Sequence, residues 1–107
     1  MTESGRVQQT QDAAPIADVN QLWIALLRHQ DAPFQTAKGL TFRYYIRGGE
    51  MFVSRKTRSI TKSTIEMAFR RAGELNGIVS GPKKLGVFGA SYLYSIFLAF
   101  GIIKPAP

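Results

Sequence analysis

The sequence predicts one small α+β domain, ordered helix, β-hairpin, helix, helix, with the helices packed on one face of a two-stranded antiparallel hairpin. Three observations predict this class. A pair of glycines, Gly48-Gly49, separates two runs of alternating apolar and polar residues, which is typical of a tight hairpin. Apolar residues recur at helical spacing on both sides of the hairpin. A further apolar segment near the carboxyl end can cover the inner face that an isolated hairpin leaves exposed.

Length and composition set the domain organisation. A chain of 107 residues with 45% hydrophobic residues is sufficient for one domain with its own core. We expect residues 1–17 to form a disordered polar tail and residues 18–104 to form the domain. Residues 1–15 lack the basic start and apolar run of a signal peptide, so we expect a cytoplasmic protein. The absence of cysteine excludes a disulfide framework, a thiolate zinc site and a cysteine nucleophile.

The first helix is expected to begin after Asp18, whose carboxylate can cap the free N–H groups of a first turn. It should end near Gln30, because Pro33 disfavours helix in the residue before it. His29, close to this end, has no second ligand type nearby and is expected to be solvated. The apolar stripe of the helix consists of Val19, Leu22, Trp23, Leu26 and Leu27.

A Gly48-Gly49 turn fixes the register of the hairpin, with residues 34–39 as a plain connection before it. The expected facing pairs are Arg47 with Glu50, Ile46 with Met51, Tyr45 with Phe52, Tyr44 with Val53, Arg43 with Ser54, and Phe42 with Arg55. Side chains alternate between faces, which places Leu40, Phe42, Tyr44, Ile46, Met51 and Val53 on the core side. The outer face then carries Thr41, Arg43, Tyr45, Arg47, Glu50, Phe52, Ser54 and Lys56.

The second helix is expected to start within residues 59–63. Ser63 and Glu66 fit a capping box, and Thr61 is a competing cap. Its buried stripe is Ile65, Ala68, Phe69, Ala72 and Leu75, and Glu66–Arg70 and Arg70–Glu74 are spaced for exposed pairing. Asn76-Gly77 provides a left-handed stop.

The last helix is expected from Tyr92 to about Phe100, after a turn-rich basic loop at residues 81–86. Residues 85–103 are nineteen residues without a charge, which meets the crude length criterion for a membrane span. Three glycines interrupt the run, and the domain needs an apolar helix to complete its core. We therefore expect a buried core helix and no membrane partner, with a membrane-anchored protein as the less favoured alternative.

Charge is concentrated in the central part of the chain. Residues 43–84 contain ten bases and three acids, a net charge of +7, whereas residues 1–31 carry four acids and two bases. A positive field of this density favours polyanions as partners. The leading hypothesis is therefore a non-enzymatic DNA- or RNA-binding protein. Its expected nucleic-acid-binding residues are Arg43, Tyr45, Arg47, Phe52, Arg55, Lys56, Arg58, Lys62, Arg70, Arg71, Lys83 and Lys84.

Two patterns support contact with nucleic acid. The outer hairpin strip combines cations with the Tyr45–Phe52 pair, a mixture that suits single-stranded or unpaired bases. The segment Ile60-Thr61-Lys62-Ser63-Thr64-Ile65 resembles the opening of a recognition helix in winged helix-turn-helix proteins, and the loop with Lys83-Lys84 resembles a basic wing. The order of elements differs from that family, because a hairpin precedes this helix and another helix follows it.

Other hypotheses stay open. The Tyr45–Phe52 face or the carboxyl-terminal helix could dock on a protein partner or a second copy, as in an assembly module. Lys83 and Lys84, beside the backbone N–H groups of residues 89–91, could hold a phosphate. Residues 81–89 lack the Lys and Ser/Thr of a Walker motif. No pattern of residues indicates an active site, a metal site or a cofactor, so we expect none of these.

Overall fold

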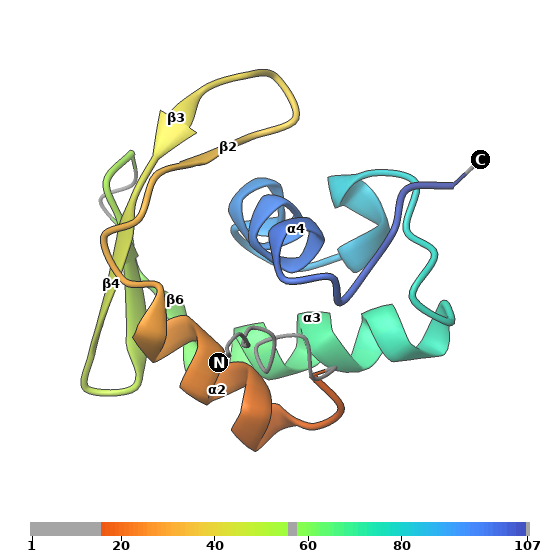
Figure 1. Ribbon diagram of the computed structural model, residues 1–107, viewed down its shortest axis with the longest axis horizontal. Helices are drawn as coiled ribbons and strands as arrows, with labels where there is room; N and C mark the ends of the chain where they lie inside the picture. Colours follow the sequence, from red (N-terminus) through yellow and green to blue (C-terminus); the bar gives the residue numbers. More distant parts are fainter. Residues whose placement is uncertain (1–15, 56–57, 107) are drawn as a thin grey trace, which may run out of the picture.

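The computed structural model describes residues 16–55 and 58–106, and it confirms the α+β class (Figure 1). The elements follow in the order α2 (Val19–Arg28), β2 (Phe34–Gln35), β3 (Thr41–Phe42), β4 (Tyr44–Arg47), β5 (Glu50–Val53), β6 (Ile60–Thr61), α3 (Lys62–Glu74), the 3-10 helix η2 (Pro82–Leu85) and α4 (Ala90–Ala99). Most of the expected tail lies outside the described residues. Ile16 belongs to the domain, because it packs against the core.

The central hairpin has the predicted register. Residues of β4 and β5 pair as Arg47 with Glu50, Ile46 with Met51, Tyr45 with Phe52, and Tyr44 with Val53. Gly48 and Gly49 have φ angles of +59° and +74°, the left-handed conformation that such a two-residue turn requires. Beyond the paired residues, the Ser54 N–H donates to the Arg43 carbonyl at 2.9 Å, which extends the expected pairing by one step.

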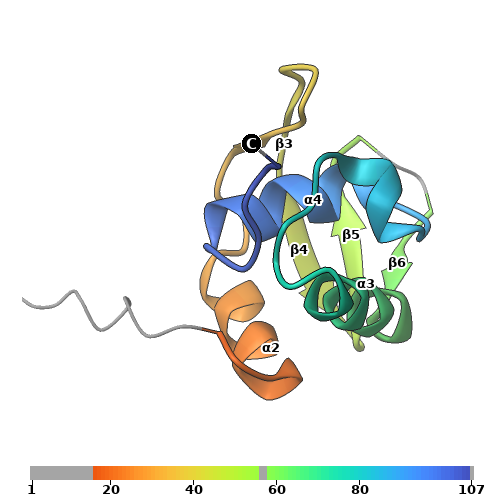
Figure 2. The same cartoon turned by 90° about the vertical axis from the view of Figure 1, so that its right-hand side faces the viewer.

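The hairpin is part of a larger sheet than expected. Strand β6 adds to β5, with Glu50 opposite Thr61 and Met51 opposite Ile60, so the sheet has three strands in the order β4-β5-β6. Residues 60 and 61, which were expected at the start of the second helix, form a strand instead, and Ile60 is buried there. The three α-helices lie on one side of this sheet (Figures 1 and 2).

The segment expected as a plain connection forms a second, smaller hairpin. Strands β2 and β3 pair through Phe34 with Phe42 and Gln35 with Thr41. This hairpin extends past the helices, as the yellow strands at the top of Figure 1 show. Leu40 lies in its turn region and is 47% exposed, so its predicted place on the core side is wrong.

Helix α3 begins two residues earlier than a cap at Ser63 would allow. The N-cap is Thr61, whose Oγ1 accepts from the Thr64 N–H at 3.3 Å, and the expected Ser63 capping box is therefore wrong. The predicted stop is confirmed. Asn76 has a φ of +57°, its N–H donates to the carbonyl of residue 73, and the Gly77 N–H donates to Ala72, as in a Schellman motif.

The basic loop before the last helix is also more regular than expected. Pro82 starts the 3-10 helix η2, which Gly86 ends with a φ of +65°. Helix α4 then runs through the core from Ala90, two residues before the expected start, and buries Leu93, Tyr94, Ser95, Ile96 and Phe97. In the described part of the chain, no helix has the length and apolar character needed to span a membrane. The predicted buried core helix is confirmed.

The core lies between the inner sheet face and the helices. Phe42, Tyr44, Met51 and Val53 are buried as predicted, and Ile46 is half-buried. The Tyr44 hydroxyl donates to the Leu26 carbonyl at 2.6 Å, which ties α2 to β4. The Tyr94 hydroxyl donates to the Val79 carbonyl at 2.9 Å, which ties α4 to the segment after α3. Residue 78 in turn forms a parallel bridge with Lys104, so the segment after α3 lies beside the segment after α4.

Candidate nucleic-acid interface

The outer face of the three-stranded sheet carries a stacked aromatic pair. The rings of Tyr45 on β4 and Phe52 on β5 have centroids 5.2 Å apart and planes inclined by only 14°. Their side chains point away from the helices because they alternate with the buried Tyr44, Met51 and Val53. Tyr45 is 46% exposed, whereas Phe52 is half-buried beside it. One face of the pair is thus available to a planar group from solvent.

Arginines flank this pair along β4. The Arg47 guanidinium lies 5.4 Å from the centre of the Tyr45 ring, within the range of a cation–π contact. Arg43, two residues before Tyr45, donates from Nη1 to the Asp31 carbonyl at 2.5 Å. Alternate residues of a strand lie about 6.6 Å apart, so the three side chains form a regular cation–aromatic–cation row.

Arg55 also lies at this end of the sheet and is held by the backbone. Its Nε donates to the Thr41 carbonyl at 2.8 Å. A guanidinium has five N–H donors, so one bond to a carbonyl leaves the others for a ligand. Arg43 and Arg55 therefore have a structural contact and remaining donors, both at the β3 end of the row.

Lys62 lies beside the hairpin turn, with its side chain on the helical side of the sheet. Its backbone N–H donates to the Gly49 carbonyl at 3.1 Å, which places the start of α3 beside the turn. Its ammonium lies 4.9 Å from the centre of the Trp23 ring on α2. Because α2 lies on the helical side of the sheet, the Lys62 ammonium does not belong to the outer face, and the outer row runs from Arg43 to Arg47. We call Arg43, Tyr45, Arg47 and Phe52 the sheet strip.

One carboxylate interrupts the outer face. In the strand register Glu50 lies opposite Arg47 of β4 and opposite Thr61 of β6. Its carboxylate accepts a short hydrogen bond from the Ser59 hydroxyl. Ser59 precedes β6, so this bond holds the carboxylate toward β6. The cationic side of the outer face is consequently the β4 side.

The edge of β4 that faces away from β5 cannot pair with an added strand. The Asp31 N–H donates to the Tyr44 carbonyl at 2.8 Å, and the Ile46 N–H donates to Gln30 Oε1 at 2.7 Å. These contacts use backbone groups that an extended peptide would need. A ligand of this surface must therefore contact its side chains.

Arg58 lies apart from the strip, at the loop before β6. Its guanidinium stands 4.2 Å from the centre of the Phe88 ring, so it links this loop to the segment before α4. Lys56, the remaining predicted residue of this loop, lies outside the described residues. Of the predicted bases in this loop, Arg58 is therefore placed by the structure, and it already contacts a ring.

The other four predicted bases lie on the opposite side of the molecule. Arg70 and Arg71 are on α3, and Lys83 and Lys84 are on η2. Figure 1 shows the sheet at one end and η2 toward the other, and in Figure 2 the sheet lies behind α3 and η2. The predicted residues that the structure describes therefore do not form one surface: the sheet strip and the α3–η2 side are separate, and Arg58 lies apart from the strip.

The predicted ion pairs of α3 differ from those observed. Arg71 Nη1 pairs with Glu74 at 3.3 Å, and this is the ion pair found among the described residues. The expected Glu66–Arg70 and Arg70–Glu74 pairs do not form there, and Arg71 rather than Arg70 contacts the Glu74 carboxylate. The expected wing is also wrong in form, since Lys83 and Lys84 lie on a 3-10 helix.

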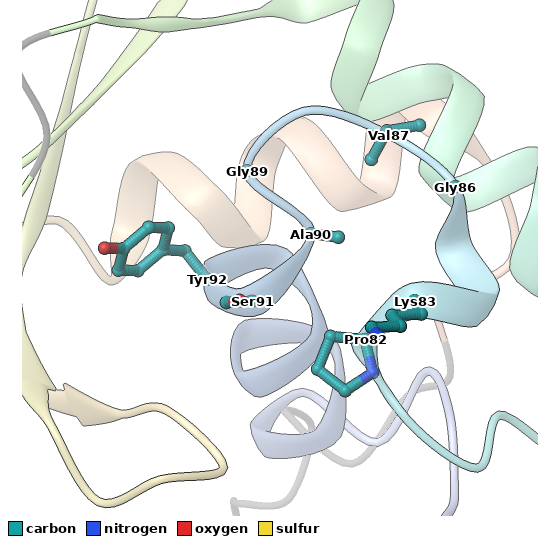
Figure 3. Close-up of a pocket in the computed structure, with 8 residues that line it drawn as sticks. All are labelled: Pro82, Lys83, Gly86, Val87, Gly89, Ala90, Ser91 and Tyr92. Atoms are coloured by element: carbon teal, nitrogen blue, oxygen red, sulfur yellow. The ribbon is translucent and has the colours of Figure 1, made fainter.

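A hollow of about 460 Å³ adjoins η2 and the start of α4 (Figure 3). It brings together Lys83 and residues 89–91, as the phosphate hypothesis required, but Lys84 does not line it. The Tyr92 ring points away from Lys83 and Gly86, with its hydroxyl on the far side. Ring stacking inside the hollow is therefore not offered by this tyrosine.

Sequence reasoning missed two rings that position cations. Trp23 was expected only in the stripe of the first helix, and Phe88 had no assigned role, yet they contact Lys62 and Arg58 respectively. Each pair joins elements distant in the sequence, so no local pattern indicated it. In residues 16–55 and 58–106, no three His, Asp or Glu side chains are grouped as a metal site would require.

Comparison of the chain with protein-family models, curated proteins and solved structures found no match. The functional argument therefore depends on the geometry and charge of these surfaces.

Proposed function

We propose that the protein is a non-enzymatic nucleic-acid-binding protein and that its sheet strip takes unpaired bases of DNA or RNA. One observation carries the proposal. The Tyr45–Phe52 stack presents a half-exposed ring in the middle of a row of cations, on the face of the sheet turned away from the helices.

Base stacking supplies the first part of the binding energy. A base stacked on an aromatic side chain contributes about 1–3 kcal/mol, with little preference among sequences because every base has a π-face. Tyr45 suits this role because Phe52 already holds one side of its ring. The ring is thus ordered before binding, and less rotamer freedom is lost when a base covers it.

Phosphate contacts supply the second part. Arg43 and Arg47 lie on β4's side of the strip, before and after Tyr45, so a strand whose base lies on Tyr45 has its flanking phosphates near cations. Such contacts release counterions, and affinity falls with salt by a slope of about 0.7 per phosphate for single strands. The strip is compatible with two flanking phosphates, because alternate strand residues are about 6.6 Å apart.

The test is a titration of fluorescein-labelled 12-nucleotide single strands, DNA and RNA, followed by anisotropy at 50 and 200 mM salt. We expect binding at 50 mM and a linear loss of log K with log salt, with weaker binding of a blunt duplex of the same sequence. No binding of any of these oligonucleotides at 50 mM salt would contradict the proposal.

A matched pair of charge variants separates the strip from net charge. Arg47→Ala removes a cation from the strip, and Lys38→Ala removes one from the exposed β2–β3 turn. We expect Arg47→Ala to weaken binding several-fold and to lower the salt slope by about 0.7, the value for one phosphate contact. We expect Lys38→Ala to change neither the affinity nor the slope measurably. Equal losses in both variants would show that only overall charge matters.

A second candidate, a protein-assembly module, is favoured by the outer side of α2. Ile24 and Leu27 are 50% and 44% exposed there, one turn apart on the helix. Neighbouring apolar groups of this size are typical of contact surfaces. Light scattering separates the candidates: a salt-insensitive oligomer that Ile24→Ser with Leu27→Ser converts to a monomer supports assembly, whereas a monomer that binds oligonucleotides supports the first candidate.

A further inference from the structure

We infer that the surface formed by α3 and η2 is a second site, which binds the phosphate backbone of a separate nucleic-acid segment, so that one protein molecule bridges two segments. Arg70, Lys83 and Lys84 are its binding residues. The inference rests on the proposed function, because the first segment is the one held by the sheet strip.

The charges of this surface are available to a ligand. Arg70, Lys83 and Lys84 are exposed, and within the described residues none of them forms an ion pair. Two carboxylates lie on the same helix, Glu66 one turn before Arg70 and Glu74 one turn after it. Glu74 is already paired with Arg71, so the surface keeps an excess of cations.

Arg71 gives the surface a fixed shape. Its Nε donates to the Lys84 carbonyl at 3.2 Å while its Nη1 contacts Glu74, so one guanidinium joins α3 to η2. The backbone that carries the two lysines is thereby fixed relative to α3. A ligand meets cations that are already positioned, which reduces the ordering cost of binding.

Two adjoining hollows lie between these cations, and their arrangement suits a chain of phosphates. A hollow of about 290 Å³ is lined by Met67, Arg70, Arg71, Glu74 and residues 85–87. The hollow of Figure 3, which Lys83 lines, shares Gly86 and Val87 with it. The two hollows therefore adjoin, with cations at both.

The α3–η2 surface is suited to contact phosphates rather than bases. No aromatic residue lines the hollow at Arg70, and in the other the Tyr92 ring points away from Lys83. Without a stacking platform, the contacts fall to phosphate oxygens, which position a nucleic acid and carry no sequence information. Duplex, with one charge per about 1.7 Å of its axis, is the denser phosphate ligand and the one we assign to this surface.

The geometry then requires two segments. The sheet strip faces away from the helices, and α3 with η2 lies on the helical side (Figures 1 and 2). A straight duplex on the α3–η2 surface cannot also place an unpaired base on Tyr45. Simultaneous occupation of both surfaces joins two segments, or two parts of one molecule that turns back.

The test is capture of one nucleic acid by another. A biotinylated 12-nucleotide single strand is fixed to beads, and a fluorescent 20-base-pair duplex is added with and without the full-length protein at 50 mM salt. We expect protein-dependent capture of the duplex. The key variant is Arg70→Glu with Lys83→Glu and Lys84→Glu, which leaves Arg71 and the sheet strip unchanged.

We expect the triple variant to bind the single strand within twofold of the parent and to lose at least fivefold of the captured duplex. If the triple variant captured as much duplex as the parent, the inference would be overturned, because bridging would then come from oligomers that use the sheet strip alone. Single-strand binding without any capture by the parent would also overturn it and leave the proposed function standing. Failure to bind either nucleic acid would overturn the proposed function as well.

Discussion

Gly89 and the side chain of Ile60 are in a contact that admits no β-carbon at residue 89. A β-carbon built on Gly89 would stand 2.4 Å from Ile60 Cδ1 and 2.8 Å from Cγ1, and the φ of this glycine is +77°. Ile60 is fully buried, and it belongs to the strand that extends the central hairpin. The contact therefore seats the start of α4 against β6.

Gly89→Ala tests this contact. Two effects combine: a left-handed φ costs a non-glycine residue about 1–2 kcal/mol, and forced overpacking of a core costs about 1–3 kcal/mol. Gly86→Ala is the matched control, because Gly86 also has a positive φ but no atom within 4 Å of its added β-carbon. We expect urea unfolding to show a larger loss for Gly89→Ala. Equal losses would show that the backbone angle alone accounts for both.

A double variant locates the clash. Ile60→Val removes Cδ1, the nearest atom, and by itself costs about 0.5–1.5 kcal/mol for the lost methyl group. In the Gly89→Ala background we expect a smaller loss or a gain, because the shorter side chain relieves the overlap. Additive losses in the double-mutant cycle would place the strain elsewhere.

Thr61→Ala and Ser63→Ala distinguish the observed cap of α3 from the one that the sequence favoured. Thr61 Oγ1 accepts from the Thr64 N–H, and substitution of such a cap by Ala costs about 0.5–2 kcal/mol. Ser63 is the second residue of α3 and is exposed. We expect its substitution to change the free energy of unfolding by less than half as much. The reverse order of losses would restore the Ser63 capping box.

How much of the fold was predictable depended on whether its signals were local. Gly48-Gly49 determined the register of β4 and β5, since only a few residues tolerate positive φ at two successive positions. The start of α3 was ambiguous because Thr61 and Ser63 both have capping hydroxyls. Strand β6 was missed because two residues cannot show alternation, and its pairing comes from the burial of Ile60.

The candidate site was predictable where it depended on strand register and was not predictable where it depended on tertiary packing. Register alone places Arg43, Tyr45 and Arg47 on the outer face, so the sheet strip follows from the sequence. The separation of Arg70 from that strip does not, because it depends on where α3 and η2 pack relative to the sheet. The contacts of Lys62 with Trp23 and of Arg58 with Phe88 likewise arise from tertiary packing.

Tyr44 gives the protein an alkaline limit of stability. The residue is 1% exposed, and burial raises the pKa of its hydroxyl well above the ordinary value of 10.0. The native state therefore keeps the proton at a pH at which the unfolded chain releases it. Stability from this group is complete below about pH 10 and is lost above it, by up to about 1.36 kcal/mol per pH unit.

Tyr44→Phe isolates that loss from the other groups that titrate at high pH. The variant lacks the bond to the Leu26 carbonyl, so we expect it to be about 1 kcal/mol less stable at neutral pH. Denaturant unfolding from pH 8 to 11 should show the parent losing its advantage as pH rises past 10. A constant difference across this range would contradict a raised pKa at Tyr44.

Substitutions at Tyr45 separate stacking from charge in the proposed function. Tyr45→Ala removes the ring that Phe52 supports, and the loss of one stacked base, about 1–3 kcal/mol, corresponds to about a five- to 150-fold weaker single-strand complex. Tyr45→Phe keeps the ring and should bind within about twofold of the parent on the same argument. Because neither substitution changes the charge, we expect the salt slope measured by anisotropy to stay at the parent value. Binding that survives Tyr45→Ala unchanged while Arg47→Ala weakens it would reduce the strip to a phosphate contact without base stacking.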